Sequence, residues 1–328
     1  MLRYLLLVLG LLTLGLLVWH IGPGNIYNAA AQLGPGALGV ILLPSLLMYV
    51  LEAYGWKLTL GPSAEHVPFA QVLAIRTAGE VVNMTTPTAY VGGEPLKAYL
   101  LQKHNVPMVD GLASVVIAKT VMTVAQILFI LMGIALGFWL LGADGSSGQI
   151  VAAALLSVGV LVFGIAGFVF VQRRGLFTWI LALLRKAGLH IRFLEAREDN
   201  LRSLDETILN FYTHHRGTFY VSAGFFFLGW LAEALEVFVI IYYLGGPATV
   251  WSAVSIGALS VFIKGGTFFI PGSLGAQDGG NLLLLKAFGY SDLTGITFAL
   301  LRRFRELVWI GIGLVCLAAI GKNGAGKA

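Results

Sequence analysis

The stretch RTAGEVVNMTTPTAYVGGEPLKAYLL, residues 76–101, combines ionisable side chains with helix breakers inside a strongly apolar chain. Its charged and amide residues are Arg76, Glu80, Asn83, Glu94 and Lys97. Pro87 and the Gly92–Gly93 pair interrupt it near its centre, which predicts two half-helices that meet at a break. An ionisable side chain within a membrane costs about 3 kcal/mol or more unless it faces a partner or a wet cavity. We therefore interpret this stretch as part of a functional site.

A second stretch, KGGTFFIPGSLGAQDGGNLLLLK at residues 264–286, repeats this pattern. Pro271 precedes Asp278 by seven residues, the interval that also separates Pro87 from Glu94. In both copies a long apolar helix follows and carries cations about three turns from its start. These cations are Lys119 after the first stretch, and Arg302 and Arg303 after the second. The pattern predicts an internal repeat whose hinges are Pro87, Pro271 and Gly275.

Composition places the chain in the membrane. Of its 328 residues 58% are hydrophobic and 11% charged, and the mean hydropathy is +0.85, which excludes an ordinary soluble domain. The net charge of +5 is explained by Lys and Arg in particular loops, so we expect no nucleic-acid partner. The single cysteine, Cys316, excludes an intramolecular disulfide, and the histidines lack ligand spacing, so we expect neither a metal nor a cofactor.

Hydropathy and charge predict an all-α polytopic membrane protein with about six full spans and two re-entrant helical hairpins, in one transmembrane domain covering 1–328. Its predicted parts are N-terminal spans at 1–67, a first repeat at 68–141, connecting spans at 142–249 and a second repeat at 250–320. Three full spans separate the hairpins, which predicts that the repeats are inverted, as in many transporters. The positive-inside rule places both termini in the cytoplasm.

Within the connecting spans, 173–217 is predicted to be a cytoplasmic amphipathic segment, because basic residues concentrate there. Leu201, Leu204, Ile208 and Phe211 follow helical spacing. Such a helix fits two positions, one on the membrane surface and one under the bundle.

The half-helix ends and cations suit a phosphate or another anionic group, because backbone N–H groups and guanidinium groups both donate to it. The predicted substrate-binding residues are Arg76, Glu80, Asn83, Gly92, Gly93, Glu94, Lys97, Lys119, Lys264, Asp278, Arg302 and Arg303. The alternative is that the cations pair internally with Glu80, Glu94, Asp278 and Glu306 and only fix the hairpins.

Three further features have structural interpretations. Glu233 and Glu236 lie within one predicted span on nearly the same face. They are either proton carriers or counter-ions for cations of the last span, and we favour the second interpretation. Glu52 lies near the end of a predicted span, which indicates an interfacial position. The Gly133/Gly137 pair predicts close helix packing.

The Glu80-x-x-Asn83-x-x-x-Pro87 stretch leading into GGEPLKAYLL, and the later IPGSLGAQD followed by ALLRR, resemble the flippase-like family that includes the transmembrane domain of lysylphosphatidylglycerol synthases. The resemblance covers nearly the whole chain and implies a multi-pass protein of the bacterial inner membrane that moves or binds polar lipids. The family's motif positions fall on Arg76, Glu80, Asn83, Pro87, Gly92, Gly93, Glu94, Pro271, Gly275, Asp278 and either Arg302 or Arg303. The same motifs also resemble a subgroup associated with hopanoid biosynthesis, which implies a hopanoid or other isoprenoid lipid and lipid-biosynthetic enzymes as partners.

Two functions are compatible with these features. The first is transport or flipping of a polar or anionic lipid, with the headgroup bound between the hairpins. The second is a lipid-modifying membrane enzyme, or the scaffold subunit of a lipid biosynthetic pathway, with Glu80 and Glu94 as acid and base. It ranks lower because no nucleophile or metal set accompanies them, and we assign no catalytic residue. The soluble aminoacyl-transferase domain of the synthases has no counterpart in 1–328, so aminoacyl transfer is not expected.

Overall fold

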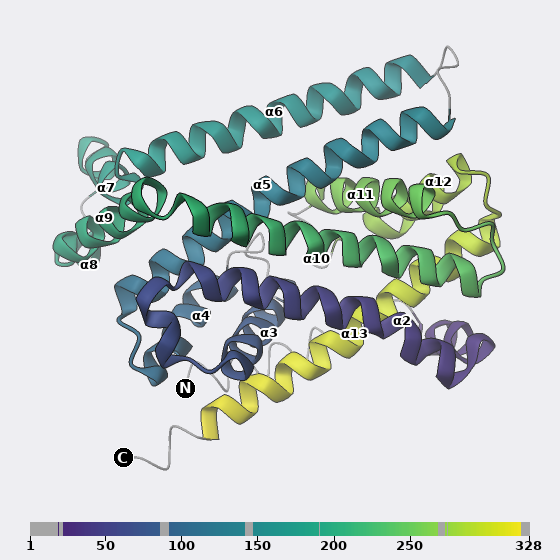
Figure 1. Cartoon of the computed structure of the whole chain (residues 1–328), viewed down its shortest axis with the longest axis horizontal. Coiled ribbons are helices and arrows are strands. Elements are labelled where there is room, and N and C mark those ends of the chain that lie inside the picture. Colours follow the sequence, from purple (N-terminus) through teal and green to yellow (C-terminus); the bar gives the residue numbers. More distant parts are fainter. Residues whose placement is uncertain are drawn as a thin grey trace.

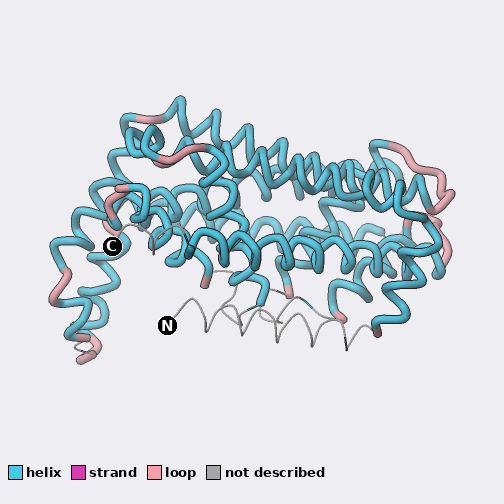
Figure 2. Tube along the Cα trace, turned by 90° about the horizontal axis from the view of Figure 1, so that it is seen from below, coloured by secondary structure: helices cyan, strands magenta, loops and turns pink. Residues whose placement is uncertain are grey.

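The computed structural model describes residues 19, 22–85, 92–141, 147–189, 191–267, 273 and 275–322. In this part of the chain the regular elements are helices and no strand occurs, which confirms the all-α prediction. Residues 1–18, 20 and 21 of the predicted N-terminal spans and the hinge residues Pro87 and Pro271 lie outside the described residues. Figure 1 shows an elongated bundle of long helices, and Figure 2 shows that most of its loops lie at the two ends.

Three helices of the described chain are by themselves long and apolar enough to cross a membrane. They are α2 (Pro23–Thr59), α5 (Met108–Leu141) and α10 (Arg216–Tyr243). A fourth crossing is supplied if α6 (Ser147–Arg173) counts together with α7 (Leu176–Lys186), a pair bent by 89°. The helix α2 changes direction at Gly34, the residue before Pro35, where the backbone leaves the helical conformation with a φ of 77°. Glycine adopts this conformation without strain. These helices support a polytopic membrane protein, while the count of six spans stays a prediction.

Two pairs of shorter helices correspond to the two interrupted stretches. The first pair is α3 (Phe69–Thr85) and α4 (Gly93–Leu101), and the second is α11 (Val250–Gly266) and α12 (Ala276–Ala287). They lie at opposite ends of the bundle (Figure 1), and the long helix α13 (Asp292–Lys322) runs from the second pair to the first. Equivalent helices make equivalent contacts: α4 packs on α5 and α12 on α13, while α3 packs on α13 and α11 on α5.

Glycine permits the two arms of the first pair to touch. The backbone N–H of Gly93 donates to Asn83 Oδ1 at 2.7 Å. A methyl group on Gly93 would overlap the carbonyl oxygen of Gly79, and one on Gly79 would lie 2.5 Å from Lys97 Cε. Elsewhere, added Cβ atoms would overlap Ala258 at Gly133 and lie 2.8 Å from Ser255 Oγ at Gly137, which confirms close packing of α5 on α11.

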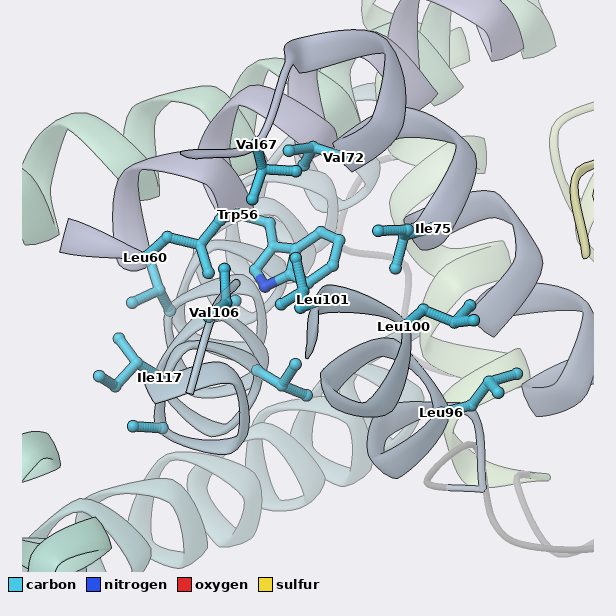
Figure 3. Packing of buried hydrophobic residues seen from close by; sticks show 14 of the residues in the cluster. Trp56, Leu60, Val67, Val72, Ile75, Leu96, Leu100, Leu101, Val106 and Ile117 are labelled. Atoms are coloured by element: carbon cyan, nitrogen blue, oxygen red, sulfur yellow. The ribbon is translucent and has the colours of Figure 1, made fainter. Parts of the chain in front are cut away.

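The apolar core at the end of the bundle that holds α3 and α4 takes residues from α2, α3, α4, α5, α9 (Glu198–His214), α10 and α13, and Figure 3 shows part of it. Trp56 of α2 lies among residues from α3, α4 and α5, and its Nε1 donates to Ser114 Oγ at 3.3 Å. The amphipathic helix α9 buries Leu204, Ile208 and Phe211 in the same core. Of its two predicted positions, α9 therefore occupies the one under the bundle. The short helices η1 (Gly61–His66), η2 (Gln102–His104) and α8 (Arg192–Glu195) complete the connections.

The close approach of Gly79 and Gly93 yields a test. We expect Gly93→Ala to reduce stability by about 1–3 kcal/mol or more, because the added methyl group has no free volume and the contacting atom is backbone. Thermal unfolding and gel filtration of the detergent-solubilised protein would measure this. The control is Gly39→Ala, since a Cβ at that exposed position of α2 meets no atom within 4 Å. Equal stability of the two variants would contradict the packing.

Candidate functional site

A cavity of about 410 Å³ lies among six helices in the middle of the bundle. This volume is within the range of about 300–1,000 Å³ that is usual for small-molecule sites. Its walls come from α2, α3, α5, α10, α11 and α13. The charged residues that line it are Glu52, Arg76, Glu80, Lys119, Glu233, Lys264, Arg305 and Glu306, and the aromatic ones are Tyr49, Trp230 and Trp309. We call it the central cavity.

The first turn of α4 carries Glu94, which gathers polar groups from three helices. Its carboxylate lies 3.0 Å from Lys97 Nζ and 3.7 Å from Lys119 Nζ. Asn83 of α3 donates from Nδ2 to Glu94 Oε1 at 3.0 Å and to Glu80 Oε2 at 3.4 Å. Its Oδ1 accepts from Gly93, so Asn83 holds the end of α3 against the start of α4.

A second void, of about 30 Å³, reaches this cluster. It is lined by Glu94 and Lys97, and also by Arg76, Glu80 and Lys119, which line the central cavity as well. Polar groups of the first interrupted stretch are therefore placed next to the cavity.

In the second stretch Asp278 caps the N-terminus of α12. Its carboxylate accepts from the backbone N–H of Gly275 at 3.1 Å, and Gly275 itself has a φ of +75° directly before α12. Arg303 binds both carboxylate oxygens of Asp278, from Nε at 2.9 Å and from Nη2 at 3.0 Å. It also donates to Glu306 Oε2 at 2.7 Å, and Glu306 in turn lies 3.3 Å from Lys264 Nζ. Bidentate pairs of this kind fix geometry as well as charge.

The carboxylates of α10 face the neighbouring arginines of α13. Glu233 pairs with Arg302, and Glu236 Oε2 lies 3.1 Å from Arg305 Nη1. Arg302 Nη1 also donates to Ser260 Oγ at 2.8 Å. This geometry agrees with the counter-ion interpretation of both glutamates. Neither Arg302 nor Arg303 lines the central cavity.

The observed position of Glu52 differs from the one expected from the sequence. Its interfacial placement is wrong, because α2 continues to Thr59 and the residue is only 3% exposed. It forms an ion pair with Arg76 and lines the cavity. One turn earlier, the Tyr49 ring stacks on Trp309 at 3.8 Å and lies 4.8 Å below the Arg76 guanidinium carbon. The spacing of Tyr49 and Glu52 on one helix face was the only sequence signal for this wall.

The predicted site residues thus separate by position. Four of them line the central cavity: Arg76, Glu80, Lys119 and Lys264. The junction of α3 and α4 holds Asn83, Gly92, Gly93, Glu94 and Lys97. Contacts around α12 and α13 hold Asp278, Arg302 and Arg303.

The ion pairs of these described residues fall into four groups, each with equal numbers of cations and carboxylates, and we combine the groups into two networks according to the helices that carry them. Network A comprises Arg76, Lys97 and Lys119 with Glu52, Glu80 and Glu94. Network B comprises Lys264, Arg302, Arg303 and Arg305 with Glu233, Glu236, Asp278 and Glu306. Within the described part of the chain no ion pair joins network A to network B, and the central cavity takes walls from both.

Some polar atoms of the cavity wall remain without a hydrogen bond to the described protein. Arg76 Nη1 and Trp230 Nε1 are buried donors of this kind. Lys119 is held most loosely among the cations of network A, because its side chain is 35% exposed and its pair with Glu94 spans 3.7 Å. Buried polar groups normally find a partner, so these donors are chemically suited to an oxygen-bearing ligand.

The comparisons with known proteins agree with the motifs. A family model described as "Lysylphosphatidylglycerol synthase TM region" matches residues 3–313. A "UPF0104 membrane protein" of Methanothermobacter thermautotrophicus is 24% identical over 331 residues, covering 97% of this chain and 96% of the relative. No solved structure matches. The family resemblance inferred from the two polar stretches is thereby confirmed.

Network B gives a stability test. We expect Arg302→Met to lower stability by about 3–5 kcal/mol, because it leaves Glu233 buried without its counter-charge. The double variant Arg302→Met/Glu233→Leu should recover much of this loss. Thermal unfolding in detergent is the measurement, with Arg185→Met as the control, since its pair with Glu198 is exposed and should matter little. A double variant no more stable than the single one would contradict the proposed pairing.

Proposed function

Because the chain belongs to the family of the lysylphosphatidylglycerol synthase transmembrane region, we propose that it transports or flips a polar or anionic lipid across the membrane, with the headgroup in the central cavity. The observation that carries this proposal is a charged cavity of about 410 Å³ enclosed by helices whose outer faces are apolar. A headgroup needs polar partners during a crossing, whereas its tails can stay in the lipid. Intramembrane charge around a cavity is typical of such pathways.

The chemistry of the wall narrows the class of headgroup. Both networks are balanced in charge, so a ligand gains from donors and acceptors rather than from a large excess of cations. Arg76 and Lys119 can bind a phosphate or hydroxyl oxygen, and Glu80, which is 23% exposed, can accept from an amine or hydroxyl. We infer a headgroup that carries hydroxyl or amino groups, whether or not it also carries a phosphate.

The finer architecture belongs to the same proposal. Both interrupted pairs are re-entrant hairpins of inverted repeats. In support of this, the first helix of each pair packs on the long helix that follows the other pair, α3 on α13 and α11 on α5. The protein lies in a bacterial inner membrane with both termini in the cytoplasm. The glycine-lined start of α4 and Glu94 guide the headgroup past Lys119. The sequence carries no nucleotide-binding motif, so an ion gradient, the lipid gradient or a partner supplies the energy.

The pair Glu94–Lys119 tests the proposal directly. We expect Glu94→Gln and Lys119→Gln to remain folded at near-normal levels while lipid translocation in proteoliposomes falls at least about tenfold, with the double variant no better than either single one. The physical reason is that Lys119 lines the central cavity and Glu94 lines the adjoining void, so each contacts the passing headgroup rather than only its neighbour. Gel filtration and a leaflet-specific reduction assay with fluorescent lipids measure the two quantities.

The matched control is Lys286→Gln, which removes an exposed cation that pairs with Asp292 far from the cavity. A purely structural pair gives the opposite pattern, in which the single variants lose folded protein and the double variant regains it. Normal translocation by a well-expressed Glu94→Gln variant would overturn the proposed site.

The second candidate is a lipid-modifying enzyme or a scaffold subunit, and one observation favours it. Glu80 and Glu94 share the amide of Asn83, so two carboxylates lie close together beside the cavity. Paired carboxylates in unlike surroundings can serve as acid and base. The motif resemblance to the hopanoid-associated subgroup would make the lipid a hopanoid and its biosynthetic enzymes the partners.

Lipid extracts of a strain that lacks this protein separate the two functions. Transport predicts unchanged lipid species with an altered distribution between leaflets or membranes, because no covalent bond is made or broken. Mass spectrometry of total extracts, with leaflet-selective chemical labelling, provides the measurement. A missing product species that the Glu80→Gln variant cannot restore would favour the enzyme instead.

A further inference from the structure

A second hollow of the protein, which we call the lateral groove, lies between α5, α6 and the junction of α9 with α10. Its volume is about 550 Å³, and it shares no lining residue with the central cavity. Val124 of α5 and Ile165, Ala166 and Val169 of α6 supply apolar walls. The volume falls in the range of about 300–1,000 Å³ that ligand sites occupy. None of the functions discussed above uses this groove.

Two arginines lie at one end of the lateral groove. Arg173 is the last residue of α6, and Arg216 is the first residue of α10. Both are exposed, and within the described part of the chain neither pairs with a carboxylate. The groove therefore has apolar walls and a cationic end, so its chemistry is complementary to the acyl chain and the negatively charged headgroup of an anionic lipid.

The cationic end is rigidly supported. The Arg173 guanidinium carbon lies 5.9 Å from the ring of Tyr212, which also lines the groove. Tyr212 Oη donates to Gln172 Oε1 at 2.9 Å, and Gln172 Nε2 donates to Thr120 Oγ1 at 3.1 Å. Gln172 is fully buried, so this network fixes the floor beneath Arg173 before any ligand arrives.

The helix α7 indicates the depth of this end in the membrane. It leaves α6 at 89° just beyond Arg173 and exposes Trp179, Ile180 and Leu183. A helix perpendicular to a span, with an exposed apolar face and basic residues at its end, lies in the plane of the membrane surface. Arg173 and Arg216 are then at the level of the lipid phosphates.

We propose that the lateral groove binds an anionic phospholipid of the adjacent leaflet, with one acyl chain against α6 and the phosphate on Arg173 and Arg216. This lipid is a bound boundary lipid and not the cargo of the central cavity. It ties α6 to α10 across the segment that contains α7, α8 and α9. Charge near an anionic surface and buried apolar length both contribute to such binding.

Native mass spectrometry of the detergent-purified full chain tests this, with phosphatidylglycerol and phosphatidylcholine of identical acyl chains as probes. We expect tighter binding of phosphatidylglycerol, and a loss of about fivefold for each of Arg173→Ala and Arg216→Ala. Arg174→Ala is the matched control, because this neighbour has the same charge but lies 4.5 Å from the Phe170 ring and outside the groove.

Ala166→Trp tests the apolar wall by filling the groove and should reduce phosphatidylglycerol binding, whereas Phe163→Trp on the exposed face of α6 should not. Thermal unfolding confirms that each variant is folded, and the loss of phosphatidylglycerol binding caused by Arg173→Ala should be the same in the background of the cavity variant Lys119→Gln. Equal binding of the two lipids, or equal losses in Arg173→Ala and Arg174→Ala, would overturn the proposal. Disappearance of the Arg173→Ala effect in the Lys119→Gln background would instead assign the bound lipid to the central cavity.

Discussion

Burial of charge in the interior of a membrane bundle is the constraint on which this structure depends. A lone ion moved out of water costs several kcal/mol even after relaxation, and its partner must lie within a few ångströms to offset that cost. Among the described residues most charged side chains of the interior have an opposite charge nearby, as Glu52 has Arg76, Glu233 has Arg302 and Asp278 has Arg303. The buried Asp205 instead accepts backbone hydrogen bonds from the start of α7. The helices that carry the paired residues are consequently held in register by the pairs themselves.

Close backbone contact makes this pairing possible. Gly79 and Gly93 bring α3 and α4 together so that one amide, Asn83, binds a carboxylate from each arm. On the other side Gly133 lets α5 approach α11, where Ser255 donates to its carbonyl oxygen at 2.8 Å. Small residues in apolar segments thus determine where the charged ones can meet.

Much of this arrangement could be predicted because it rests on local patterns. The repeated interval from proline to carboxylate located both interrupted pairs, and the same repeat related Glu94 to Lys119 and Asp278 to the arginines of the last helix. Long-range geometry was not accessible in this way. Adjacent residues of a helix point about 100° apart, so only the packing of α13 decides that Arg302 faces α10 and Arg303 faces α12. Glu52 was misplaced for the same reason, since its burial depends on how α2 lies against α3.

The separation of the ion pairs into two balanced networks has a mechanical consequence. Network A belongs to α2, α3, α4 and α5, and network B to α10, α11, α12 and α13, while hydrogen bonds such as Trp309 Nε1 to Ser45 Oγ at 2.9 Å cross between them. The two halves of the bundle are joined instead by extensive packing, above all of α2 on α10, α5 on α11 and α3 on α13. Their mutual position is therefore set by side-chain shape and apolar contact around the central cavity rather than by ion pairing.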